Sequence, residues 1–305
     1  MKTVNINDRV KNVSVIGIGC MRLNGLQGEK QVQELVETAM AGGINFFDHA
    51  DIYGGGECEE IFGRAVAPSL REKMILQTKC VIRPGVCYDS SKEYILQQVD
   101  ASLRHLRTEY IDILLLHRPD ALMEPEEIAE AFDVLEQSGK VRAFGVSNHN
   151  PMQIELLNSC CGGRIRVNQI QYSIAHCPTI DAGLNFNIAN DAGCSRDNSV
   201  IEYARWKKLQ LQAWSPFQYG MFEGTFLGNE RFPELNAVLE RLASQYDTTT
   251  NAIAVAWILR HPAQIQCIVG TTNKERVKGL AAASDIKLTR EEWYELYLAA
   301  GKQLP

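Results

Sequence analysis

The sequence has no long apolar run, no excess of basic residues and no regular cysteine pattern. No apolar stretch approaches the ~20 residues that a membrane-spanning helix needs, and residues 1–12 lack the apolar region of a secretion signal. The net charge of -6 over 305 residues argues against a general nucleic-acid or anionic-membrane surface, although a local basic pocket could hold a small anion. We therefore expect a cytoplasmic protein that binds neither nucleic acid nor membrane.

The nine cysteines are scattered, odd in number and without a C-x-x-C pair. Cys160 and Cys161 are adjacent, a spacing that suits neither a zinc site nor a disulfide framework. The sequence also lacks the G-x-S-x-G motif of a serine nucleophile and any cluster of metal ligands. These absences favour a reducing compartment and predict no metal site.

What the sequence contains is an alternation of short apolar runs with helical patterns. The apolar runs are residues 13–19, 44–50, 74–79, 111–117, 141–148, 166–173, 209–216 and 265–270. In residues 29–40 the apolar side chains follow the i, i+3, i+4, i+7 spacing of one helix face, and Gly42 and Gly43 then supply a helix stop. Similar helical patterns cover residues 91–106, 125–138, 198–207 and 251–260.

Eight strand–helix units in about 300 residues fit a (β/α)8 TIM barrel better than an open doubly wound sheet. An open sheet that binds a dinucleotide needs G-x-G-x-x-G in its first turn, and the nearest candidate, GIGCMR at 17–22, has arginine in place of the third glycine. We therefore expect a single α/β barrel domain over residues 1–305, with residues 1–12 as an N-terminal lid segment on its bottom. Long loops, residues 174–197 and 217–233, follow the sixth and seventh strands, and connections of that length are usually functional or disordered.

Polar side chains stand where the apolar runs stop. In a (β/α)8 barrel the carboxyl ends of the strands form the active site. The polar residues at or near these ends are Asp48, Lys79, His117, Ser147, Asn148, Gln169 and Trp214. Each one alone has an ordinary explanation, such as a helix cap, a solvated charge or a core residue. Their shared placement at one end of a closed barrel favours a common site.

The pattern around Asp48 and Lys79 points to proton transfer. A buried lysine next to an aspartate forms an ion pair, and its ammonium lowers the pKa of a neighbouring tyrosine from ~10 towards neutrality. Tyr53 stands just before three glycines, which permit a loop that holds this tyrosine over the strand ends. A proton donor without a nucleophile suggests that a cofactor supplies the other half of the reaction, and hydride transfer is the leading case.

Several motifs occur at the strand ends in a family-specific order. They are FFDHADIYGGGECEEIFG (46–63), LQTKC (76–80), LLLHRPD (114–120), GVSNH (145–149), NQIQY (168–172), WSP (214–216) and VGTTNKERV (269–277). With these motifs the sequence resembles the aldo-keto reductases, which are (β/α)8 barrels that use nicotinamide cofactors, from about Val13 to Ala283. The resemblance implies that Tyr53 is the general acid and that Asp48 and Lys79 tune it. It also implies that His117 orients the substrate carbonyl and shares in proton delivery.

The same resemblance implies how the cofactor NADP(H) is held. The implied contacts are Ser147, Asn148 and Gln169 on the nicotinamide carboxamide, Trp214 on its ring, Ser215 and Phe217 on the pyrophosphate, and Gly270, Thr271 and Arg276 on the adenosine phosphate. A preference for NADPH over NADH follows, because arginine donates bidentate hydrogen bonds to a phosphate. Gly279 and Leu280 stand where many members have a Glu–Asn pair that reaches the adenine.

The implied function is NADPH-dependent reduction of an aldehyde or ketone, a small-molecule carbonyl substrate, to an alcohol. One alternative is a barrel that binds NADPH as a sensor or regulatory subunit with slow turnover. A second alternative, a metal-dependent barrel hydrolase, needs several histidine or aspartate ligands at strand ends, where the sequence offers only His117 as a histidine.

Overall fold

The computed structural model describes residues 1–186, 188, 190–194 and 199–302. Eight parallel strands close into a barrel in the order β10-β11-β12-β3-β4-β5-β8-β9. The barrel strands are β3 (Ile16–Gly19), β4 (Phe46–Asp48), β5 (Ile75–Cys80), β8 (Ile111–Leu116), β9 (Val141–Ser147), β10 (Ile165–Gln171), β11 (Gln210–Trp214) and β12 (Gln266–Val269). Each predicted apolar run contributes one of these strands, so the predicted (β/α)8 barrel is confirmed.

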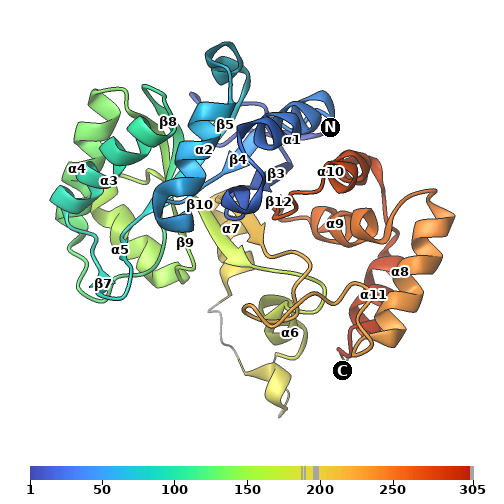
Figure 1. Cartoon of the computed structure of the whole chain (residues 1–305). Coiled ribbons are helices and arrows are strands. Elements are labelled where there is room, and N and C mark those ends of the chain that lie inside the picture. Colours follow the sequence, from blue (N-terminus) through green and yellow to red (C-terminus); the bar gives the residue numbers. More distant parts are fainter. Residues whose placement is uncertain (187, 189, 195–198, 303–305) are drawn as a thin grey trace.

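Helices surround the barrel, with α3, α4 and α5 on one side of Figure 1 and α8 to α11 on the other. Their bounds are α1 (Glu29–Ala41), α2 (Glu57–Ala65), α3 (Lys92–His105), α4 (Pro125–Gln137), α5 (Pro151–Cys161), α6 (Pro178–Leu184), α7 (Val200–Lys207), α8 (Pro233–Gln245), α9 (Thr250–Arg260), α10 (Lys274–Ala281) and α11 (Arg290–Ala299). The predicted helix over 29–40 is α1, and Gly42 and Gly43 end it as expected. The other predicted helical segments are α3, α4, α7 and α9, although residue 198 at the start of one of them lies outside the described residues.

The N-terminal segment packs against the barrel at the end where the strands begin. The run 13–19 is divided, because Val13–Ser14 forms β2, which pairs with β1 (Thr3–Val4) in an antiparallel hairpin before β3 starts. Ile6, Val10 and Val13 of this segment pack with Phe46 and other apolar residues of the barrel strands. The lower barrel interior is therefore apolar, and the polar residues of the barrel lie nearer the opposite end.

The two long segments after β10 and β11 contact each other. The hydroxyl of Ser173 donates to the carbonyl of Gln218 at 2.6 Å, and Gln218 in turn forms a bridge with Thr225. Within 174–197 the chain forms α6, whose Asp181 accepts hydrogen bonds from Tyr297 and Lys302 near the C-terminus. Residues 187, 189 and 195–197 of this segment lie outside the described residues.

Candidate active site

Asp48 and Lys79 form a buried ion pair at the ends of the neighbouring strands β4 and β5. The Lys79 ammonium lies 2.8 Å from each carboxylate oxygen of Asp48 and donates to the carbonyl of His49 at 2.7 Å. Asp48 is 2% exposed and Lys79 is fully buried. Burial is the largest single influence on Lys79 and lowers its pKa, but the Asp48 carboxylate and the Tyr53 oxygen together outweigh burial, and the pKa stands above its ordinary value. Lys79 is therefore an ammonium at neutral pH.

Tyr53 reaches this ion pair from the loop that follows β4. The loop continues through the 3-10 turn η2 (Tyr53–Gly56), in which Gly54, Gly55 and Gly56 have φ of 61°, 69° and 99°. Only glycine adopts these left-handed angles in succession without strain, so the three glycines permit the sharp turn into α2. The turn places the Tyr53 hydroxyl 3.2 Å from the Lys79 ammonium, which donates to it.

The prediction that Lys79 lowers the pKa of Tyr53 below its ordinary value is wrong. Burial raises the pKa of the phenol above its ordinary value, and the Lys79 ammonium, which acts in the opposite direction, does not cancel this effect. The reason is that Tyr53 is partly buried against the core, and removing the phenol from water penalises a phenolate. Tyr53 is consequently protonated at neutral pH and carries a proton that it can donate.

His117 completes the predicted tetrad from β8. Its backbone N–H donates to the carbonyl of Cys80 at 2.9 Å, which continues the pairing of β8 with β5. Its imidazole meets the Tyr53 ring edge-on, with ring centroids 6.1 Å apart and an interplanar angle of 83°. Burial, followed by the charges of Lys79 and Arg118, lowers the pKa of His117 to about 2. The imidazole is therefore neutral over the working range of most enzymes.

The four residues that the resemblance assigns to the nicotinamide lie at the ends of β9, β10 and β11. Trp214 donates from its indole to the side-chain oxygen of Asn148 at 3.1 Å, and Asn148 donates to the hydroxyl of Ser147 at 2.8 Å. The Ser147 hydroxyl donates to the carbonyl of Gln169 at 3.0 Å. The side chain of Gln169 points elsewhere, because its amide donates to Asp48 at 3.2 Å and to Gln212 at 3.1 Å.

The residues assigned to the two phosphate groups follow β11 and β12. Ser215 has a left-handed φ of 50°, and Phe217 is half-buried against the main core. Gly270 and Thr271 lead into α10, where the Asn273 side chain accepts from two backbone N–H groups of the first turn. Arg276 is exposed in that first turn. A helix N-terminus with an exposed arginine is a favourable place for a phosphate.

Sequence reasoning missed a set of polar side chains inside the barrel. Gln77, Gln212 and Gln266 are fully buried, and Gln77 donates to Asp48 at 2.6 Å. The available signal was alternation: Gln77 stands two residues before Lys79 and so shares its face of β5. A second missed feature is the buried pair of carboxylates formed by Asp51 and Glu59, in which burial and the charge of Glu59 raise the pKa of Asp51 to about 7.

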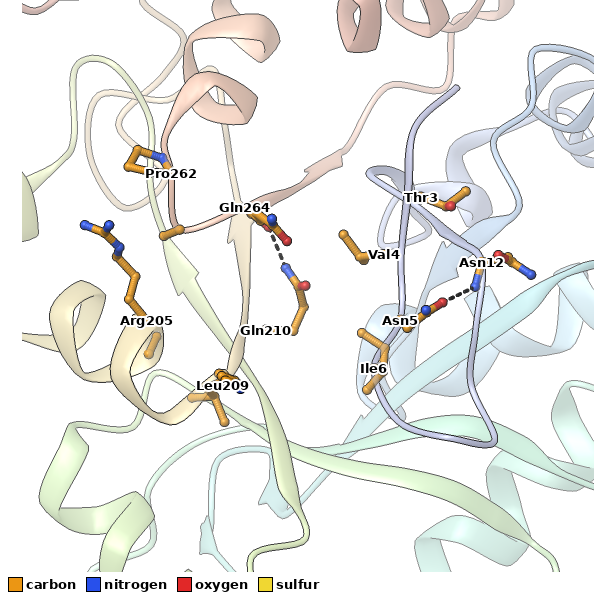
Figure 2. Close-up of a pocket in the computed structure, with 13 residues that line it drawn as sticks. Thr3, Val4, Asn5, Ile6, Asn12, Arg205, Leu209, Gln210, Pro262 and Gln264 are labelled. Carbon is orange, nitrogen blue, oxygen red and sulfur yellow. Dashed lines mark hydrogen bonds between the residues drawn. The ribbon is translucent and has the colours of Figure 1, made fainter.

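A cavity of about 590 Å³ lies at the opposite end of the barrel, between the N-terminal hairpin and the starts of β11 and β12 (Figure 2). Gln210 and Gln264 lie on its wall and are joined by a hydrogen bond of 2.8 Å. No residue of the predicted tetrad or cofactor site lines it, so it is separate from the candidate active site. Across the described part of the chain, no helix has the length and apolar character of a membrane span, and no three metal-binding side chains come together.

Comparisons with known proteins point in one direction. A match to the aldo/keto reductase family covers residues 15–297. The chain is 35% identical over 319 aligned residues to the 6-dehydroglucose reductase of Agrobacterium fabrum, with 100% of both chains covered. It is 37% identical over 301 residues to the uncharacterized oxidoreductase YcsN of Bacillus subtilis, with 94% of both chains covered. Among solved structures, the aldo/keto reductase of Klebsiella pneumoniae in complex with NADP and acetate has a TM-score of 0.79 at 24% identity, over 99% of this chain and 97% of that one.

Proposed function

Because the chain belongs to the aldo/keto reductase family, we propose that it reduces aldehyde or ketone carbonyls to alcohols, with NADPH as hydride donor and Tyr53 as general acid. The observation that carries the proposal is the 3.2 Å contact between the Lys79 ammonium and the Tyr53 hydroxyl, beside the buried carboxylate of Asp48. A protonated phenol gives up its proton most readily where a fixed positive charge stabilises the phenolate that is left.

His117 orients the substrate in this proposal. A neutral imidazole donates one hydrogen bond, and a ring that stands edge-on to Tyr53 is placed to share the carbonyl oxygen with the phenol. The pKa of about 2 supports this role over proton delivery, because an imidazolium is not populated at neutral pH. The proton then comes from Tyr53 alone.

The residues present fit NADPH. When it is bound, NADPH supplies the hydride for the carbonyl carbon. The hydrogen-bonded side chains of Ser147 and Asn148 offer groups for the carboxamide, and the flat indole of Trp214 lies beside them for the nicotinamide ring. At the other end, Thr271 and Arg276 flank the capped N-terminus of α10, which suits the 2′-phosphate. Ser215, Phe217 and Gly270 complete the proposed contacts, and Gln169, whose two N–H groups are held by Asp48 and Gln212, has only its side-chain oxygen to offer the carboxamide.

The relative that shares 35% identity over its full length is named for the reduction of 6-dehydroglucose, an aldehyde-bearing sugar. We therefore propose polyhydroxylated aldehydes as the first substrate class to examine. The intact tetrad supports catalysis over a purely sensory role, because every contact that tunes Tyr53 is formed.

The test is NADPH oxidation by the purified protein with nitrobenzaldehyde as a generic substrate and with a sugar aldehyde, followed by identification of the alcohol. We expect stoichiometric alcohol formation with repeated turnover. A single-turnover rate far above the steady-state rate would instead indicate a sensor that is held up at cofactor release. No alcohol from either substrate would contradict the proposal.

A further inference from the structure

Four buried glutamines form a layer in the barrel interior at the level of Asp48. They are Gln77 in β5, Gln169 in β10, Gln212 in β11 and Gln266 in β12, each at most 2% exposed. In the strand register Gln169, Gln212 and Gln266 are successive partners across three strands. Gln77 is the register partner of Asp48 on the adjacent strand. The layer therefore links β10, β11 and β12 to β4 and β5, although these two groups of strands do not pair directly in the sheet.

The layer ends on one oxygen of the Asp48 carboxylate. Oδ1 accepts from Gln77 at 2.6 Å, from Lys79 at 2.8 Å and from Gln169 at 3.2 Å. Oδ2 accepts from Lys79 at 2.8 Å. All of these partners are donors, so the arrangement is the one that an ionised carboxylate needs, and it leaves the carboxylate one orientation.

Gln77 is itself held by Gln212 across the barrel. The amide of Gln77 donates to Gln212 at 2.8 Å, and the amide of Gln212 donates back to Gln77 at 3.0 Å. Gln212 also donates to Gln266 at 3.2 Å, and Gln266 donates to the carbonyl of Ser14 at 3.0 Å. Both N–H groups of Gln77 are thus used, one for Asp48 and one for Gln212.

A layer of this kind is unfavourable unless every member is paired. An unpaired amide in the interior costs about 1–3 kcal/mol, whereas apolar side chains of similar size fill a barrel without that risk. The apolar layer around Phe46 shows that this barrel packs such side chains elsewhere. The polar layer stands where its dipoles act on the Asp48–Lys79 pair.

We propose that Gln77, held in place by Gln212, is a positioning residue for the reductase reaction. It fixes the Asp48 carboxylate, which holds the Lys79 ammonium at the Tyr53 hydroxyl. Without the hydrogen bond from Gln77, the negative charge on Oδ1 of Asp48 attracts the Lys79 ammonium more strongly. The ammonium then moves towards Asp48 and away from Tyr53. The inference rests on the proposed function, because it acts through Tyr53 as the acid.

The test compares Gln77→Met with Gln212→Met and with Gln210→Met as the matched control. Gln210 lies on the same strand as Gln212 but at the far end of the barrel, where its amide bonds Gln264 (Figure 2). For Gln77→Met we expect kcat to fall about 10- to 100-fold, with KM and NADPH affinity within about twofold of the native values, because only the alignment of the acid changes. Gln212→Met should reduce kcat less, about 3- to 10-fold, and Gln210→Met should leave it unchanged.

The pH profile separates positioning from a structural role. If Lys79 moves away from Tyr53, the pKa of the phenol rises, and the alkaline limb of kcat moves to higher pH in Gln77→Met and Gln212→Met but not in Gln210→Met. A lower melting temperature with native kcat and an unmoved limb would overturn the inference. If Gln77→Met does not fold, kcat and the position of the alkaline limb in Gln212→Met test the inference in its place. Native turnover in Tyr53→Phe, measured in parallel, would overturn the proposed function instead.

Discussion

The Lys79 ammonium lies 3.2 Å from the Tyr53 hydroxyl, and the two groups come from different elements of the barrel. The two carboxylate oxygens of Asp48 each accept a hydrogen bond of 2.8 Å from this ammonium. The Lys79 ammonium lowers the pKa of the phenol, whereas burial raises it by more. Tyr53 therefore keeps its proton at neutral pH and still has a cation beside the oxygen that becomes negative when the proton leaves.

Replacing Lys79 by methionine removes the cation that stabilises the Tyr53 phenolate. The expected loss in kcat is about 10²- to 10⁴-fold, the range typical of general acid catalysis. The change also leaves the Asp48 carboxylate buried without its ion-pair partner, which costs about 3–5 kcal/mol of unfolding free energy. Denaturant unfolding and NADPH oxidation measure the two effects.

A double variant separates stability from catalysis at the same site. Asp48→Asn combined with Lys79→Met removes both charges, so we expect it to regain much of the lost stability and none of the lost turnover. Recovery of turnover in the double variant would show that Lys79→Met acts by destabilising the fold rather than by its effect on Tyr53.

His117 should not titrate near neutral pH. Its pKa of about 2 means that the native state binds no proton there, whereas the unfolded chain binds one below about 6.5. The contribution of His117 to stability is therefore complete above pH 6.5 and is lost as the pH falls towards 2. His105 is the internal control, because Glu59 raises its pKa. We expect NMR to show His105 titrating with a pKa above its ordinary value while His117 stays neutral, and a His117 midpoint near its ordinary pKa would contradict this.

Asp51 should make the protein less stable as the pH rises. Burial raises its pKa to about 7 from an ordinary value of 3.8, so the native state holds a proton that the unfolded chain has lost. Unfolding free energy consequently falls as the pH rises from about 4 to 7, by about 2–4 kcal/mol in total. Asp51→Asn should raise the melting temperature more at pH 8 than at pH 5. The exposed Asp8→Asn should have no such effect, and an equal gain at both pH values would contradict the account.

Arg276 should set the choice between the two nicotinamide cofactors. Loss of a charge-assisted contact to the 2′-phosphate in Arg276→Ala is expected to raise KM for NADPH about 10- to 100-fold. KM for NADH should stay the same, because that cofactor has no 2′-phosphate. Lys278→Ala, which removes another exposed cation of α10, is the control. Equal losses with both cofactors would place Arg276 elsewhere in the binding site.

The barrel and the tetrad follow from local patterns in the sequence. Each strand is a short apolar run, and in a barrel the polar residues at the ends of such runs must meet at one rim, as Asp48, Lys79 and His117 do. Tyr53 is identified by its place before Gly54–Gly56, whose positive φ angles the structure shows. The conformation of 174–197 is not predictable in this way, because long connections have no repeating pattern.

Two properties of the site depend on packing that no local pattern reveals. The pKa of Tyr53 is raised because burial against the core penalises the phenolate, and the opposing effect of Lys79 is smaller than the effect of burial. The glutamine layer depends on the register between strands, since Gln77 and Gln212 are 135 residues apart and meet across the barrel. A sequence pattern shows that each is buried but not that they form a pair.

The most direct measurement of the central claim is the turnover of Tyr53→Phe with nitrobenzaldehyde and NADPH, beside that of Tyr203→Phe. Tyr203 lies on α7, where its hydroxyl bonds Glu155 away from the tetrad. With Tyr53 as the acid, Tyr53→Phe should lose about 10²- to 10⁴-fold in kcat while it binds NADPH as the native protein does, and Tyr203→Phe should keep native turnover. Undiminished turnover in Tyr53→Phe would contradict the assignment of the acid.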